Sequence, residues 1–161
     1  MQIFIAHAKE DAEWAQKLKG FLETSIPGLY VFLSPYDLQP ADPMWQKTLR
    51  ELGRSSALIA LISRHYFHSN AREEVGYAFR IALERRMRII PIVIDPEVAS
   101  PLRLPAMISH LKALDFTRNP AQAWSDLLRF LQQLKQTQQH LLLGAALAAL
   151  LLFLWTFDKR E

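Results

Sequence analysis

The amino-acid sequence predicts an α/β fold, in which an open, mostly parallel sheet of five strands carries helices on both faces. Two observations lead to this prediction. Short apolar runs alternate with amphipathic helical patterns along most of the chain. Ala57 to Ser63 is a short continuous apolar run, which is typical of a strand covered on both faces. We therefore expect one compact domain over residues 1–136, a short linker at 137–140, an apolar helix at 141–157 and a short tail at 158–161.

The strand patterns indicate where a ligand would bind. They are Gln2–His7, Leu29–Ser34, Ala57–Ser63, Arg88–Ile94 and Leu111–Phe116. Pro91 lies within the fourth, and because proline removes a backbone donor we expect an edge or a bulge there. Sheets of this kind bind ligands beyond the carboxyl ends of the strands, where the strand order switches. The loops after His7, Ser34 and Ser63 should therefore surround one crevice.

Helical patterns separate these strands. One runs from about Asp11 to Thr24, and the last from Ala121 to about Gln136. Another begins at Pro43, since the missing amide of a first-turn proline costs nothing. The preceding SPYDLQPADP loop is long for a strand-to-helix connection, which makes it a candidate functional loop.

The helix after the central strand opens with two carboxylates, Glu73 and Glu74. With Asn70 as the N-cap, Glu73 falls at the third helical position and can bond free backbone donors, as in a capping box. The apolar stripe of this helix comprises Ala71, Val75, Ala78, Phe79 and Ala82. At about 100° per residue, Glu74 lies on the flank of the stripe while Glu73 points away. Glu74 thus faces the seam between helix and sheet; favourable interaction of both carboxylates with the helix dipole is the alternative interpretation.

The composition excludes several classes of protein. At 161 residues and 50% hydrophobic content, the chain can bury a sizeable core. The net charge of +3 comes from scattered Lys and Arg, densest near the end of a helix, so nucleic-acid binding does not follow. The absence of cysteine excludes disulfides and thiol catalysis and is compatible with a reducing compartment. The N-terminus has no basic and then apolar leader, so we expect no secretory signal peptide.

The segment from Leu141 to Phe157 contains no charged residue. At 1.5 Å per residue it spans about 26 Å, which is at the low end for a transmembrane helix. We expect it to cross a membrane with Trp155 as an interfacial anchor; a helix buried against the domain or a second copy is the alternative. Gly144 and Ala148 have the small-xxx-small spacing that lets helices approach closely in lipid.

Several familiar chemistries are missing from the sequence. It contains no GxxxxGK[ST], GxGxxG or GxSxG motif. His65 and His68 have no third ligand nearby in sequence, so we expect no metal site. Glu10 and Asp11 after the first strand are similar to the acidic pocket of a response-regulator receiver. The central strand, however, ends in Ser63 rather than an aspartate, and no lysine closes the fifth strand.

Three strings in order resemble the boxes of the Toll/interleukin-1 receptor (TIR) domain family, in its bacterial form. They are FIAHAKED at Phe4–Asp11, VFLSPYDLQPADPMW at Val31–Trp45 and LISRHYFHSNAREEVGYAF at Leu61–Phe79. The resemblance runs from Ile3 to about Leu134 and implies the TIR fold, a flavodoxin-like five-stranded parallel sheet. Glu74, just before Val75-Gly76-Tyr77-Ala78, matches the position of the catalytic glutamate in TIR enzymes.

The resemblance implies cleavage of the bond between nicotinamide and ribose in NAD⁺, which is a substrate here and not a cofactor. Glu74 is the expected catalytic residue. The expected substrate-binding residues are Ala6, His7, Lys9, Tyr36, Asp37, Trp45 and Ser63. A core position is the alternative for Trp45. The product, ADP-ribose or a cyclic form, stays open.

The resemblance also implies self-association of TIR domains and, for a bacterial protein, a role in defence against phage. With the apolar segment as anchor, the expected location is the inner membrane, with the domain facing the cytoplasm. Two alternatives stay open: a non-catalytic scaffold that acts through TIR–TIR contacts, and an effector whose clustered apolar helices disrupt the membrane.

Overall fold

The computed structural model describes residues 1–33, 43–68 and 71–158, and describes the backbone alone at residues 44, 71, 74 and 150–158. The chain divides into two compact units, Met1–Leu127 and Leu128–Glu161. The first contains the whole sheet, and the second contains most of the C-terminal helix.

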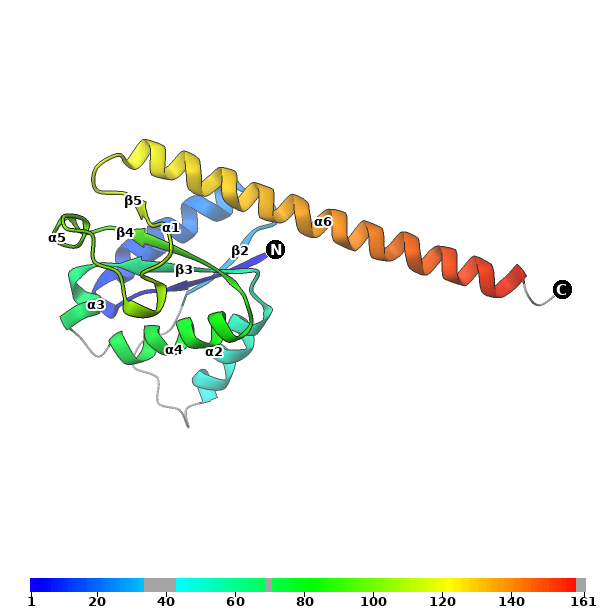
Figure 1. The fold of residues 1–161 in the computed structure, drawn as a ribbon, viewed down its shortest axis with the longest axis horizontal. Coiled ribbons are helices and arrows are strands. Elements are labelled where there is room, and N and C mark those ends of the chain that lie inside the picture. The colour runs from blue at the N-terminus through cyan, green and yellow to red at the C-terminus, as the bar shows by residue number, and fades with distance from the viewer. Residues whose placement is uncertain (34–42, 69–70, 159–161) are drawn as a thin grey trace. The chain divides into compact units, whose positions relative to one another are not determined.

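The sheet of the first unit has five parallel strands in the order β2-β1-β3-β4-β5 (Figure 1). The strands are β1 (Gln2–Ala6), β2 (Tyr30–Leu33), β3 (Ala57–Ile62), β4 (Arg88–Val93) and β5 (Leu114–Asp115). This order is the flavodoxin-like one, and it confirms the predicted fold. β5 is shorter than the predicted strand at 111–116, because only Leu114 and Asp115 pair with β4.

Pro91 lies in β4 without a bulge, in a strand that is inner in the sheet order but is not paired with β5 at this residue. β4 runs between β3 and β5, and Pro91 lies opposite Ala60 in a regular register. The Ile94 amide donates to the Ile62 carbonyl of β3, so the nitrogen of residue 91, three positions earlier, faces the other side by alternation. On that side β5 pairs only with Ile92 and Val93. The sheet therefore loses no backbone hydrogen bond through the missing donor of Pro91.

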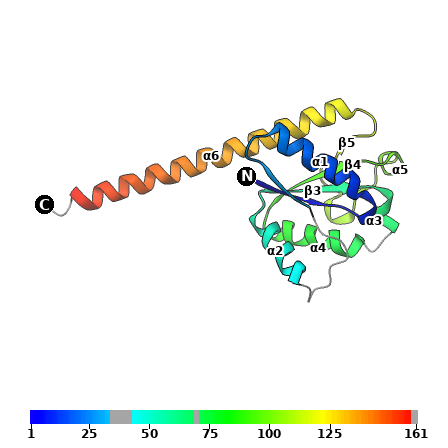
Figure 2. The ribbon, with the colours of Figure 1, turned by 180° about the vertical axis from the view of Figure 1, so that it is seen from behind.

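Helices cover both faces of the sheet (Figures 1 and 2). On one face lie α1 (Ala12–Ser25) and the first turns of α6 (Pro120–Asp158); on the other lie α2 (Pro43–Arg54) and α4 (Ala71–Glu84). Within the described residues, the loops contain four short elements: η1 (Lys9–Asp11), α3 (Arg64–His68), α5 (Pro96–Ala99) and η2 (Ala106–Ile108). The sequence predicted none of these four, because such short segments show no helical period.

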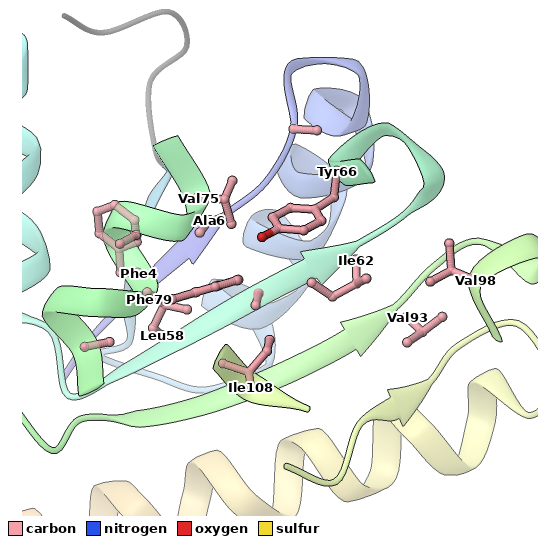
Figure 3. Packing of buried hydrophobic residues seen from close by; sticks show 14 of the residues in the cluster. Phe4, Ala6, Leu58, Ile62, Tyr66, Val75, Phe79, Val93, Val98 and Ile108 are labelled. Carbon is pink, nitrogen blue, oxygen red and sulfur yellow. The ribbon is translucent and has the colours of Figure 1, made fainter. Parts of the chain in front are cut away.

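The core beneath α4 joins helix and sheet (Figure 3). Phe4 and Leu58 from the strands and Phe79 from α4 are completely buried in one cluster. Val75, Ala78 and Ala82 belong to the same cluster, which confirms the apolar stripe at its described positions. Burial of a side chain such as Phe79 stabilises the fold by about 1.5–3 kcal/mol. This packing fixes the position of α4 on the sheet.

Four aromatic rings tie the start of α6 to α1. Trp14 and Trp124 stack with ring centroids 6.5 Å apart, and Phe116 packs edge-on against both. Phe21 lies 4.1 Å from Trp124 between ring centroids. Trp14 of α1 and Trp124 of α6 are thus packed on each other.

α6 continues without interruption through the linker predicted at residues 137–140. Gln, Leu and Ala dominate residues 131–149 around this segment, and all three favour helix. Leu141, Leu142, Leu143 and Leu147 are 61–71% exposed. No helix among the described residues is long and apolar enough to cross a membrane, so the structure does not support the predicted transmembrane helix. The inner-membrane location, which depended on that helix, stays a prediction.

Candidate functional site

The carboxyl ends of β1 and β3 form the centre of the candidate site. Ala6 lies opposite Ala60 in the parallel register, so the segments after both strands emerge side by side. β1 is flanked by β2 on one side and β3 on the other, which makes this the point where the strand order switches. The prediction that the loops after His7 and Ser63 adjoin is confirmed. The loop after Ser34 lies outside the described residues.

A buried hydrogen bond joins these two segments. The Ser63 hydroxyl donates to Asp11 Oδ2 at 2.6 Å, and the same hydroxyl oxygen accepts the His65 amide at 3.1 Å. Asp11 is 7% exposed and Ser63 2% exposed. Burial raises the pKa of Asp11 above its usual value, while the Ser63 hydrogen bond and the nearby histidines act in the opposite direction. Asp11 was not among the predicted site residues, although its place after the first strand was noted.

His7 and Ala6 lie beneath the site and not on its surface. Ala6 is fully buried in the core cluster, and His7 is 3% exposed. His7 Nδ1 lies 2.8 Å from the Ala8 carbonyl oxygen, so Nδ1 carries the proton. Burial lowers the pKa of His7, which keeps the ring neutral. In this conformation both side chains support the loop and are not accessible to a substrate; Lys9, in η1, is exposed.

Trp45 packs on the helix that begins with the two glutamates. Its ring centroid lies 4.6 Å from that of Tyr77, and the planes are tilted by 48°. Tyr77 is one turn after Glu74 in α4. The Trp45 ring is half-buried. Its packing on Tyr77 agrees with the alternative of a core position, and substrate binding by Trp45 stays a prediction.

The described residues place Glu74 by its backbone alone, in the first turn of α4. Glu73, its neighbour, is exposed, as the capping interpretation expects. Two further predicted residues, Tyr36 and Asp37, lie outside the described residues.

A cavity of about 450 Å³ opens at the same edge of the sheet, on the side of α1. Among the predicted site residues that the structure describes, Ser63 lines this cavity, together with Asp11. One wall is held by Arg64, whose Nε donates to Asp95 Oδ2 at 2.7 Å and whose Nη1 donates to Glu97 at 2.7 Å. Burial raises the pKa of Asp95, but hydrogen bonds from Arg64 and the Glu97 amide outweigh it, and the pKa lies below its usual value.

The described residues contain no group of three His, Asp or Glu side chains arranged to hold a metal ion. His65 and His68 are both in α3, where His65 is partly buried and His68 exposed. Carboxylates, a hydroxyl and an aromatic ring are among the groups that the described residues bring to this edge.

The strand order and the site at its switch point define an α/β protein of the flavodoxin-like class. A family model described as the TIR domain matches residues 3–131, and the chain therefore belongs to the TIR domain family. The family resemblance predicted from the three sequence boxes is confirmed.

Solved structures of several proteins share this fold. The TIR domain of the Toll-related receptor TRR-2 from Hydra magnipapillata shares 23% identity over 81% of this chain and 97% of its own, with a TM-score of 0.61. The TIR domains of the activated Roq1 resistosome, which directly recognises the pathogen effector XopQ, share 13% over 82% and 98%, with a TM-score of 0.57. A prokaryotic SEFIR domain shares 16% over 80% and 96%, with a TM-score of 0.56. At these identities the likeness shows the fold alone. No match was found among curated proteins.

Proposed function

We propose that this chain cleaves the bond between nicotinamide and ribose in NAD⁺, with Glu74 as the catalytic carboxylate. The TIR family includes NAD⁺-cleaving enzymes and many members without catalysis. One observation supports the enzyme: Val75, next to Glu74, packs in the same buried cluster as Ala6 and Ala8 at the end of β1. The first turn of α4 therefore packs on the same core as the end of β1, near the carboxyl ends of the strands, where sheets of this kind bind ligands.

The chemistry suits a carboxylate that is held in place. Cleavage passes through a state in which the ribose resembles an oxocarbenium ion, as in other glycoside chemistry. Nicotinamide leaves as a neutral molecule from a cationic precursor, so no general acid is needed. A carboxylate near the ribose stabilises the developing positive charge, and preorganised electrostatics of this kind is usually the largest catalytic contribution. Capture by water would give ADP-ribose, and capture by the adenine ring a cyclic product.

The packing of α4 supports such preorganisation. Val75 and Phe79 are fixed in the core, and Tyr77 is held against Trp45. A helix anchored on two sides keeps its first turn within the narrow geometry that catalysis requires. In the proposal, Trp45 stacks on a base, and Lys9, Tyr36 and Asp37 complete the substrate contacts.

We include self-association of the TIR domain in the proposal. TIR domains commonly self-associate, and those of the Roq1 resistosome are an assembled example. Assembly would raise activity where a neighbouring subunit completes the active site. The biological setting that we propose is defence signalling against phage.

The test is nicotinamide release from NAD⁺ by the full chain. Wild type, Glu74→Gln and Glu73→Gln would be compared, because the two variants remove neighbouring carboxylates from one helical turn. We expect loss of release with Glu74→Gln alone, with the product then identified by mass spectrometry. Equal loss in both variants would refute the assignment to Glu74. No release by folded, assembled wild type would refute the enzyme and favour the scaffold.

A further inference from the structure

The cavity on the α1 side is formed by segments from three strand ends. Its lining comes from η1 and the first turns of α1, from Ser63 and the start of α3, and from the segment after β4. The residues are Glu10, Asp11, Glu13, Trp14, Lys17, Ser63, Arg64, His65, Ile94, Asp95 and Pro96. At about 450 Å³ it falls in the size range of small-molecule sites. α4, which carries Glu74, covers the opposite face of the sheet (Figures 1 and 2).

The charges of this lining are unbalanced. It contains four carboxylates against two cationic side chains, Lys17 and Arg64. Lys17 is paired with Glu13 at 2.7 Å, and Arg64 is paired with Asp95 at 2.7 Å. Each cation of the lining is thus already neutralised by a carboxylate of the lining. The negative charges of Glu10 and Asp11 are left without a Lys or Arg of the lining to balance them, and the two raise each other's energy because they are neighbours.

Glu10 and Asp11 present different oxygens to the cavity. Glu10 is exposed and makes no ion pair or hydrogen bond with the described residues through its side chain. Asp11 is more than nine-tenths buried, and its Oδ2 is taken by Ser63. Its Oδ1 accepts no hydrogen bond from the described part of the chain. Because this oxygen reaches solvent, it can accept a hydrogen bond from a donor that enters the cavity.

Trp14 adds an aromatic wall beside these carboxylates. Its ring is held by Trp124 and Phe116 and is therefore fixed in orientation. An indole ring attracts organic cations through the negative face of its π system, and the attraction grows where water is excluded. Carboxylates beside a rigid indole recognise a guanidinium or ammonium group, and the same lining repels phosphates and other anions.

We propose that this cavity binds a small organic cation, a guanidinium or primary ammonium group, between Glu10, Asp11 and Trp14. The cation belongs to a free small molecule or to an arginine or lysine side chain of a second copy of this chain. Because the site is on the α1 side, it is separate from the proposed NAD⁺ chemistry of Glu74.

Isothermal titration calorimetry of the full chain with agmatine tests the proposal, since agmatine carries both a guanidinium and an ammonium group. The variants are Glu10→Gln and Asp11→Asn, and Glu84→Gln, an exposed carboxylate at the end of α4, is the matched control. We expect agmatine to bind and each cavity variant to weaken binding on the order of three- to tenfold. Glu84→Gln should bind like wild type, and inorganic phosphate should not bind. Circular dichroism checks that each variant is folded.

Sedimentation velocity distinguishes the two sources of the cation. Agmatine binding with unchanged self-association assigns the site to a free small molecule. Self-association that agmatine and Glu10→Gln both weaken assigns it to a side chain of a second copy. The proposal is overturned if agmatine neither binds nor weakens self-association. It is also overturned if both cavity variants bind agmatine as well as the wild type does. Glu74→Gln should bind agmatine like wild type. The binding result can therefore be interpreted even if the NAD⁺ proposal fails.

Discussion

Asp11 and Ser63, 52 positions apart in sequence, are joined by a buried hydrogen bond of 2.6 Å at the carboxyl end of the sheet. The bond ties the segment after β1 to the segment after β3. These segments border the switch point where both proposed sites lie. Substitution of Asp11 or Ser63 should therefore change both the stability of the fold and the shape of the carboxyl end of the sheet.

Replacing Asp11 with Asn should stabilise the protein at neutral pH. Burial raises the pKa of Asp11 in the folded state, so ionisation opposes folding. Stability from this group is therefore present below the ordinary aspartate pKa and is lost as pH rises through the raised folded pKa. Asn keeps an acceptor for Ser63 without the charge. Urea unfolding at neutral pH should show a free energy of unfolding higher than that of wild type by up to about 1 kcal/mol, and this difference should disappear in acid. A loss at neutral pH would contradict the raised pKa.

Replacing Ser63 with Ala should destabilise the fold by about 1–3 kcal/mol. The substitution leaves the Asp11 carboxylate buried without its donor, and the cost of an unsatisfied buried charge exceeds that of a lost neutral bond. A double-mutant cycle with Asp11→Asn isolates the interaction. The cost of Ser63→Ala should be smaller when Asp11→Asn is already present; equal costs would show that the two side chains do not interact.

Asp95 should have the opposite pH dependence to Asp11. Despite its burial, hydrogen bonds from Arg64 and from the Glu97 amide hold the pKa of Asp95 below its usual value. Its contribution is therefore present above the ordinary aspartate pKa and is lost as pH falls through the depressed one. Asp95→Ala, which also removes the N-cap of α5, should cost about 1–2 kcal/mol at neutral pH. Thermal unfolding in acid should show a smaller difference between the two proteins.

The outer edge of β2 should become prone to association when its cover is removed. The Val31 amide donates to Glu23 Oε1 at 2.8 Å, and the Lys19 ammonium group donates to the Val31 carbonyl. Two side chains of α1 thus occupy backbone groups that an exposed edge strand would offer to another chain. Glu23→Ala with Lys19→Ala should increase light scattering on concentration. Lys17→Ala with Glu13→Ala, an exposed pair on the same helix, is the control.

Truncating Phe79 should test how firmly α4 is anchored. Phe79 is completely buried between α4 and the sheet, so Phe79→Ala should cost about 3–5 kcal/mol. Phe21 is 41% exposed, so Phe21→Ala should lower the free energy of unfolding clearly less than Phe79→Ala does. If the enzyme proposal holds, Phe79→Ala should also lower nicotinamide release at temperatures where the protein is still folded, because the first turn of α4 is less rigidly held.

The sequence alone determined the architecture of this protein. The continuous apolar run from Ala57 to Ser63 and the helical spacing of Val75, Ala78 and Phe79 are both local properties of the chain. For the same reason the family was recognisable from three short strings. Local pattern also placed Glu74 in the first turn of a helix, where its backbone is found.

Only the tertiary structure decided which side chains meet at the edge of the sheet. Nothing in the sequence pairs Asp11 with Ser63, because their bond depends on the parallel register of β1 and β3. The tertiary structure also buried His7, which had been expected to contact substrate. It placed the Pro91 nitrogen on the side of β4 that β5 leaves unpaired at this residue. Burial, charge pairing and cavity shape arise from segments far apart in the chain, so their energies are fixed only once the strands have found their neighbours.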